Sequence, residues 1–188
     1  TDLLRLELAW TASNLASRAS AIAVAVYAYQ TNGIGAVGII AFVRLIIAAA
    51  TSPWLAVLAD RRPRRAVLIG SDLVRVLLLG GMAVLVLGGV AAPVAYVLAV
   101  LVAIPEPLFR SAQGAHTPSL VRTPDELTAA NVVATGVESV GLFAGPALGA
   151  LLLATSGTGT VFAATAGLAL VSVVLAARIS LRTMARLG

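Results

Sequence analysis

The chain has 188 residues, of which 60% are hydrophobic and 11% are charged, and its formal net charge at pH 7 is +5. Its mean hydropathy of +1.00 is far too high for a soluble domain of this size, so the composition predicts an all-α integral membrane protein. The chain has no cysteine and one histidine, which excludes disulfides and thiolate metal sites and leaves almost no histidine metal chemistry. We therefore expect no metal, no cofactor and no enzyme activity, because no nucleophile can be paired with a base.

Six apolar stretches, separated by short polar or glycine- and proline-containing joints, are long enough to cross a membrane, since a span needs about 20 residues. In chain order the predicted spans are 6–29, 34–58, 66–88, 93–113, 126–153 and 160–178. The sixth stretch is apolar apart from small hydroxyls. We expect it to face lipid and to support the other spans.

Positive charge in the joints follows an alternating pattern. Arginines precede the first span, fill the joint between the second and third spans, flank the joint between the fourth and fifth, and follow the sixth, at Arg5, Arg61, Arg62, Arg64, Arg65, Arg110, Arg122, Arg178, Arg182 and Arg186. The other three joints carry no charge. Because arginine-rich loops stay on the cytoplasmic side, the pattern predicts a cell-membrane protein with both ends of this segment in the cytoplasm. The net charge is then a topology signal, and no nucleic-acid partner is expected.

Polar and charged side chains inside the predicted spans are candidate functional residues, because an ionisable group in hydrocarbon costs roughly 2.5 to 3.5 kcal/mol. Asn14 and Arg18 share one face of the first span at i and i+4, and Arg44 lies in the second span. Glu106 lies between two prolines in the fourth span, and Glu138 lies near the predicted midplane of the fifth. Structural ion pairs explain these residues equally well, and the sequence does not decide which arginine pairs with which glutamate.

The most distinctive stretch runs from Ala56 to Leu68 and reads A-V-L-A-D-R-R-P-R-R-A-V-L. It resembles the signature Gly-x-Leu-Ala-Asp-Arg-x-Gly-Arg-Arg-x-x-Leu that follows the second span of major facilitator superfamily transporters. Ala56 and Pro63 stand in place of the two glycines of that signature. The positions that match it are Leu58, Ala59, Asp60, Arg61, Arg64, Arg65 and Leu68.

The resemblance implies that this loop helps to close the cytoplasmic side in one transport conformation. The third predicted span opens with Asp72 and Arg75, which share a helix face at i and i+3. Carried over to this chain, the cytoplasmic latch would consist of Asp60, Arg61, Arg64, Arg65, Asp72 and Arg75. A plainer interpretation makes the arginines topology determinants only, but it leaves the two carboxylates among them unexplained.

Glycines recur every four residues in the fifth predicted span, at Gly141, Gly145 and Gly149, with Pro146 directly after the second. Such a stripe allows close helix packing. The pattern also resembles the antiporter motif of exporters in the same superfamily, which implies export, although helix packing alone explains it equally well. The stretch 109–131 resembles bacterial enterobactin-exporter-type and related multidrug efflux members.

The resemblance as a whole implies the N-terminal half of a twelve-span transporter, with two inverted three-helix repeats in each half. Its expected partners are the lipid bilayer, a small organic substrate, protons, and a second six-span half that we expect beyond Gly188. Glu138 is the first candidate for proton coupling, because the charge of a membrane carboxylate depends on its exposure and its neighbours. Two other functions stay open, namely a non-transporting membrane scaffold that associates through the glycine stripe, and facilitated uptake without protons.

Overall fold

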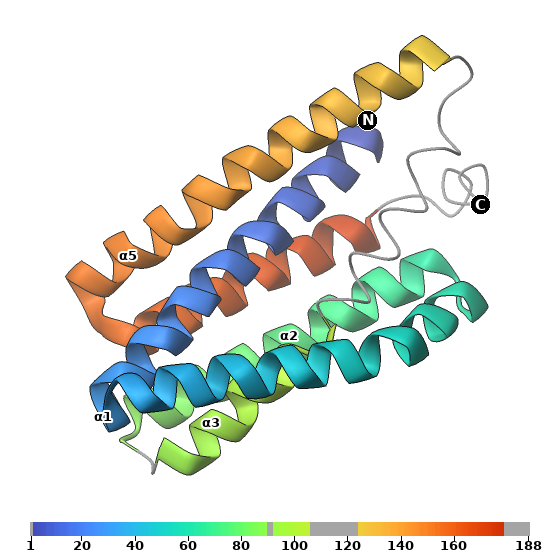
Figure 1. The fold of residues 1–188 in the computed structure, drawn as a ribbon. Helices are drawn as coiled ribbons and strands as arrows, with labels where there is room; N and C mark the ends of the chain where they lie inside the picture. Colours follow the sequence, from blue (N-terminus) through green and yellow to red (C-terminus); the bar gives the residue numbers. More distant parts are fainter. Residues whose placement is uncertain (1, 90–91, 106–123, 179–188) are drawn as a thin grey trace.

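A computed structural model describes residues 2–89, 92–105 and 124–178, with side chains described for 8–59, 61–63, 66–89, 92–105, 135–136 and 138–178. This part of the chain forms four helical elements, which are α1 (Asp2–Arg61), α2 (Arg64–Leu87), α3 (Ala92–Leu101) and α5 (Pro124–Ala177) (Figure 1). They are apolar helices, as the composition predicts. Of the predicted span 93–113, α3 reaches Leu101, and residues 106–113 lie outside the described part.

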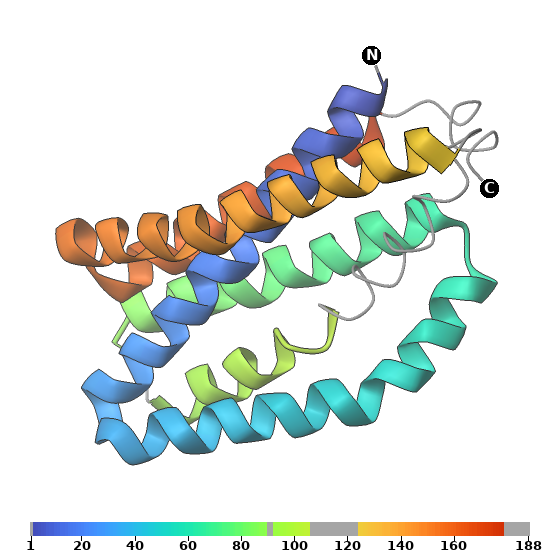
Figure 2. The same ribbon diagram turned by 45° about the horizontal axis from the view of Figure 1, so that its top comes forward.

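Two of these elements are too long to cross a membrane as straight rods. The 60 residues of α1 would extend about 90 Å, roughly three times the thickness of a hydrocarbon core. The helix is interrupted at Gly33, where φ is 73°, and the 54-residue α5 is interrupted at Gly157, where φ is 80°. At both glycines the chain doubles back (Figure 2). Each element therefore has a first and a second segment, which are 2–32 and 34–61 in α1, and 124–156 and 158–177 in α5.

The glycines at which the chain reverses lie in the three uncharged joints between predicted spans. Gly89, with φ of 67°, lies between α2 and α3 and shares a positive φ with Gly33 and Gly157. A residue with a side chain that holds a positive φ of this kind lowers the stability of the fold by roughly 1 to 3 kcal/mol, whereas glycine adopts it freely. Glycine therefore permits tight reversals that bring consecutive segments together.

Replacing Gly157 with alanine should lower the free energy of unfolding by about 1 to 3 kcal/mol, because alanine would have to adopt a φ of 80° with a ψ of 174°. Gly167→Ala is the matched control, since Gly167 lies inside the same element and has open space where a Cβ atom would be added. Alanine at that position should stabilise the helix by up to about 1 kcal/mol. Thermal unfolding of the purified variants in detergent measures both changes. Equal midpoints for the two variants would contradict the role that we assign to Gly157.

The first segment of α1 is the packing centre of the bundle. It lies alongside α5 and reaches the side of the bundle that holds α3 (Figure 2). The side chains of Ala16, Ala19, Ala23 and Ala28 on this segment are fully buried. Small side chains let neighbouring backbones approach closely, which is the main source of attraction between helices in lipid.

An aromatic cluster joins three elements near the glycine turns. The ring of Tyr27 meets the rings of Tyr96 and Phe162 edge to face, at centroid distances of 5.9 and 6.5 Å. The hydroxyl of Tyr96 shares a hydrogen bond with the hydroxyl of Thr31. Because these side chains come from α1, α3 and α5, the cluster holds one end of the bundle together.

The second segment of α5 is buried along one face, so the expectation that the sixth predicted span faces lipid is wrong for that face. Phe162 and Thr165 are fully buried and Ser172 is nearly so, whereas Leu170 and Val174 on the other side are exposed. The hydroxyl of Thr165 donates to carbonyls of its own helix, so its burial leaves no polar group without a partner. Small and hydroxyl-bearing residues at helical spacing give this segment a flat face for packing.

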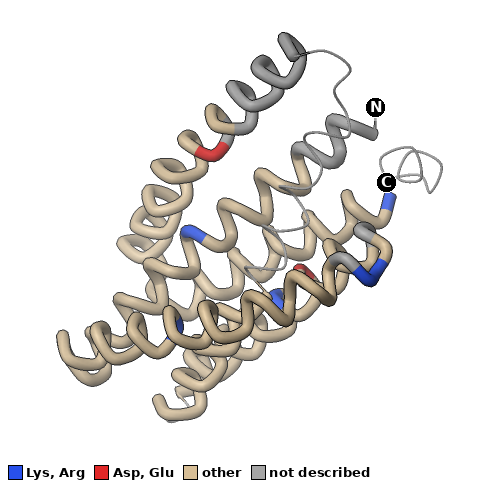
Figure 3. Tube along the Cα trace, turned by 45° about the vertical axis from the view of Figure 1, so that its right-hand side comes forward, with Lys and Arg blue, Asp and Glu red and all other residues tan. Residues whose placement is uncertain are grey.

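Three of the described helices are long and apolar enough to cross a membrane, over Leu8–Ala59, Ala66–Leu87 and Glu138–Ala177, and the shorter Ala92–Leu101 is also apolar. Charged residues are sparse along the helices drawn in Figure 3. The first and third of these stretches contain the glycine reversals at Gly33 and Gly157. The count of six spans and their orientation in the membrane stay predictions.

Candidate functional site

The glycine stripe of the fifth predicted span packs directly against the polar face of the first. A Cβ atom placed on Gly145 would lie 2.4 Å from the Cβ atom of Arg18. One placed on Gly141 would lie 3.9 Å from the Cγ atom of Asn14. Because carbon atoms in contact stay about 3.5 to 4 Å apart, a side chain at 145 cannot share the space that Arg18 occupies.

The same stripe brings the two backbones together. A Cβ atom on Gly149 would lie 3.1 Å from both the Cα atom and the carbonyl oxygen of Ala19. Contact positions advance together along both helices, so the first segments of α1 and α5 run parallel (Figure 1). We call this contact the α1–α5 seam, and its residues are Asn14, Arg18, Ala19, Gly141, Gly145 and Gly149.

Glu138 lies on the same face of α5 as the stripe, closer to the start of the element. It precedes Gly141 by three residues, and about 10 Å of helix rise separates it from Gly145. Its side chain is exposed, whereas Pro146, inside the helix, is half-buried. Glu138 therefore lies at the edge of the seam, about two helical turns from the contact with Arg18.

The structure brings some of the candidates from the sequence together and separates others. Asn14 and Arg18 are half-buried and meet the glycine stripe in the seam. Arg44 is half-buried in the second segment of α1, which is a different helix of the bundle. Glu106 lies outside the described residues.

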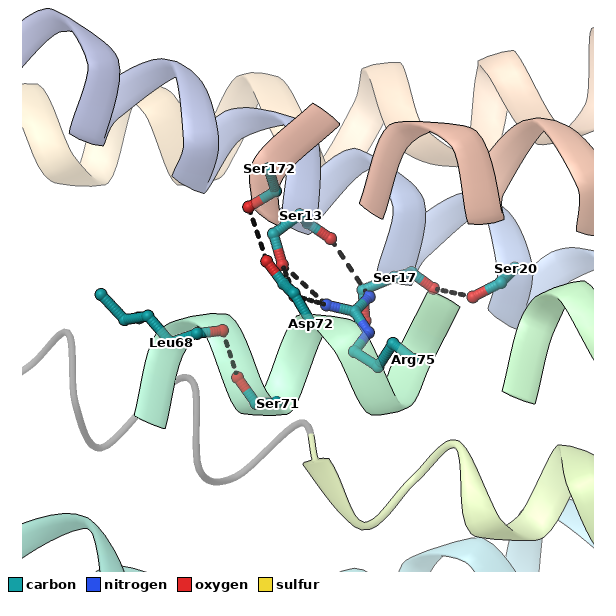
Figure 4. Close-up of polar contacts among 8 residues, drawn as sticks. All are labelled: Ser13, Ser17, Ser20, Leu68, Ser71, Asp72, Arg75 and Ser172. Carbon is teal, nitrogen blue, oxygen red and sulfur yellow. Dashed lines mark hydrogen bonds and ion pairs between the residues drawn. The ribbon is translucent and has the colours of Figure 1, made fainter. Parts of the chain in front are cut away.

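A second polar site lies inside the bundle, where α2 meets the first segment of α1 and the second segment of α5 (Figure 4). Asp72 accepts hydrogen bonds from the hydroxyls of Ser13 and Ser172, at 2.8 and 2.5 Å. Arg75 donates from Nη1 to the Ser13 hydroxyl at 2.7 Å and to Asp72 at 3.2 Å, and from Nη2 to the Ser13 carbonyl at 3.2 Å. We call this group the Asp72–Arg75 cluster, and its members are Ser13, Asp72, Arg75 and Ser172.

The Asp72–Arg75 cluster is a neutral assembly with almost no access to solvent. The exposed fraction is 2% for Asp72 and for Arg75, and 1% for each of the two serines. Buried charges are tolerated only when they are paired and hydrogen-bonded, and here each carboxylate oxygen receives a hydroxyl donor. Within the described part of the chain, the Nε atom of Arg75 is buried without an acceptor. Among the described residues, the hydrogen bonding of the Arg75 guanidinium is therefore incomplete at its Nε atom.

Sequence reasoning identified the charged pair of this cluster but missed its serine partners. Ser13 directly precedes Asn14, and Ser172 lies in the stretch that was expected to face lipid. The missed signal was spacing: Ser13, Ala16 and Ser20 recur at i, i+3 and i+7, and all are buried. Small residues at helical spacing mark a packed face in a membrane helix.

The six residues of the predicted latch do not all lie in one environment. Arg61 is exposed in the last turn of α1, next to the exposed Arg62. Asp72 and Arg75 lie in the bundle interior, where their hydrogen bonds reach α1 and α5. The three remaining members are at the end of α1 and the start of α2, with side chains outside the described set, and are Asp60, Arg64 and Arg65. A closed latch of all six stays a prediction.

The family model described as Major Facilitator Superfamily matches residues 9–186, which is nearly the whole chain. A search of curated proteins found no match. The matched range includes both the α1–α5 seam and the Asp72–Arg75 cluster.

Proposed function

This chain belongs to the major facilitator superfamily, a family of membrane transporters, and we propose that it is one half of a secondary active exporter of a small organic molecule. In this proposal its six spans form two inverted three-helix repeats, and both ends of the segment lie on the cytoplasmic side of the cell membrane. Substrate crosses as this bundle rocks against a second six-span half.

The observation that supports the proposal best is the α1–α5 seam. A helix contact that serves only to join two spans needs small residues, and Gly149 against Ala19 supplies that kind of contact. The seam also accommodates the stem of Arg18, at a position where Gly145 leaves the space for it. A guanidinium among membrane helices is costly, so its retention in a fitted gap favours a role in substrate binding or coupling.

In the proposed mechanism the polar residues have different roles. Asn14, Arg18 and Arg44 bind the substrate or balance the charge that it brings. Glu138 exchanges a proton with the aqueous side that is open at the time, and Glu106 is the second candidate for this role. A carboxylate is charged when it faces water and takes up a proton when its surroundings become apolar, so a change of access changes its charge. Inward proton movement then drives outward substrate movement.

The two conformations need a closing contact on the cytoplasmic side. In our proposal the basic loop between α1 and α2 supplies it, through Asp60, Arg61, Arg64 and Arg65. The glycine stripe lets the first segments of α1 and α5 stay in contact while the bundle moves as a body.

Glu138→Gln is expected to abolish proton-coupled export without lowering the amount of protein, because glutamine keeps the shape of the side chain but cannot exchange a proton. The measurement uses inside-out membrane vesicles that contain the full-length transporter, an acidic lumen, and ethidium as the fluorescent probe. Protons leaving the lumen should drive ethidium into it. Glu126→Gln, in the first turn of α5, is the matched control and should transport normally.

The possible outcomes of this experiment distinguish the candidate functions from one another. Normal ethidium uptake by Glu138→Gln would contradict the coupling role of Glu138. Uptake by the parent protein that does not depend on the pH gradient would favour facilitated transport. A properly inserted parent protein that moves neither ethidium nor protons would favour the scaffold function.

A further inference from the structure

We propose that Asp72 and Arg75 are positioning residues, which set the rotation of the first segment of α1 and so hold Asn14 and Arg18 in the α1–α5 seam. The role assigned here to Asn14 and Arg18 rests on the proposed transport function. The positioning itself is a structural property that can be measured without transport.

The rotation of the first segment of α1 about its own axis decides what two consecutive residues contact. Ser13 faces α2 and the second segment of α5, where it joins the Asp72–Arg75 cluster (Figure 4). Asn14 faces the first segment of α5, where it approaches Gly141. Successive residues of a helix point about 100° apart, so a rotation by that angle could turn Ser13 toward the first segment of α5 but would turn Asn14 away from it. Fixing the direction of Ser13 therefore also fixes that of Asn14, and of Arg18 one turn further on.

Hydrogen bonds are the contacts that can specify this rotation. The alanines of the segment, such as Ala16 and Ala19, form a smooth face, and dispersion contacts between smooth faces change little when a helix turns. Ser13 is different, because its hydroxyl donates to Asp72 and accepts from Arg75 while its carbonyl also accepts from Arg75. Hydrogen bonds to charged groups are directional and about twice as strong as neutral ones.

The cluster also connects this rotation to the rest of the bundle. Ser172, which is 100 residues from Asp72 in sequence, holds the second oxygen of the same carboxylate. Asp72 is thus held between the first segment of α1 and the second segment of α5, and its own position cannot follow a turning α1 freely. The carboxylate belongs to α2 and is also held by α5, so it gives the first segment of α1 a fixed hydrogen-bond partner.

The experiment uses the rate of disulfide formation to report the rotation of the helix, and residues 1–188 contain no native cysteine that could compete with an introduced pair. Asn14→Cys combined with Gly141→Cys places two thiols across the seam, where the structure brings these positions into contact. Leu87→Cys combined with Gly159→Cys is the reference pair, since a Cβ atom on Gly159 would lie 2.7 Å from the Leu87 side chain. Rates of oxidation are followed in membranes that contain the full-length transporter.

Ser13→Ala and Asp72→Asn are each expected to slow formation of the 14–141 disulfide by about tenfold, the factor that corresponds to losing a hydrogen bond to a charged group. The 87–159 disulfide should form at the parent rate in both variants. Ser20→Ala is the matched control, because Ser20 is equally buried on the same segment but its hydroxyl donates to the carbonyl of Ser17 in its own helix. Ser13→Thr keeps the hydroxyl, so the 14–141 disulfide should form at the parent rate in that variant.

Two outcomes would overturn the inference. One is a 14–141 rate that is unchanged in Ser13→Ala and Asp72→Asn, and the other is an equal slowing of both disulfides, which would show general unfolding without selective rotation. The result is independent of transport. If the 14–141 rate falls selectively but the parent protein moves no ethidium, the positioning role stands and the proposed function fails.

Discussion

Asp72→Ala is expected to lower the free energy of unfolding by about 3 to 5 kcal/mol, because it leaves the Arg75 guanidinium buried without its counter-ion. The exposed fraction of Arg75 is 2%, so solvent cannot take the place of the carboxylate. The hydroxyls of Ser13 and Ser172 would lose their acceptor in the same change. Thermal unfolding of the purified protein in detergent, followed by circular dichroism, measures the loss.

A double variant separates the loss of pairing from the loss of packing. Asp72→Leu combined with Arg75→Met removes both charges and keeps similar volume, and such replacements of buried ion pairs are often neutral or stabilising. We expect it to unfold close to the parent midpoint. Arg61→Gln, at an exposed position, should change the midpoint little. A double variant as unstable as Asp72→Ala would mean that the loss comes from the missing hydrogen bonds of the cluster and not from an unpaired buried charge.

The second large effect that we expect is a loss of transport in Gly145→Ala, by about 100-fold, because a displacement of about 1 Å at a positioned polar group has consequences of this size. The added Cβ atom would lie 2.4 Å from that of Arg18, so the first segments of α1 and α5 must separate or Arg18 must move. Overpacking of this kind also destabilises by about 1 to 3 kcal/mol. Ethidium uptake by energised vesicles and thermal unfolding measure the two effects.

Gly136→Ala tests whether the effect is specific to the seam. Gly136 lies in the same segment of α5, but none of the described residues has an atom within 4 Å of the Cβ position, so alanine there should leave transport unchanged. Arg18→Gly combined with Gly145→Ala removes the atom that the new methyl group meets. This variant is expected to regain stability without regaining transport. Normal transport by the single variant Gly145→Ala would show that the seam does not position Arg18 for function.

Parts of the candidate site could be predicted from local patterns, and parts could not. The stripe at Gly141, Gly145 and Gly149 indicates a close contact wherever it packs, because the spacing puts all three glycines on one face. Asn14 and Arg18 are visible as polar groups in an apolar stretch. That these two features meet each other follows from the arrangement of the helices, which no local pattern contains.

The partners of Asp72 illustrate the same limit. Arg75 is one turn away and could be predicted as its neighbour, whereas Ser13 and Ser172 are 59 and 100 residues away in sequence. A serine in an apolar helix commonly bonds a carbonyl of its own backbone, as Ser20 and Ser71 do here. The residue type alone therefore does not show whether a serine forms a hydrogen bond to another helix.

The amino-acid sequence by itself determined the helical membrane class and the places where the chain reverses, because apolar length and a glycine in an uncharged joint act locally. Only the tertiary structure decided which helix faces are core. The misassigned second segment of α5 shows why: in lipid, an exposed Leu170 and a buried Phe162 both have apolar surroundings, so hydropathy does not distinguish a packed face from a lipid face. That distinction arises from the close fit of small residues and from hydrogen bonds between helices, which exist only once the bundle has assembled.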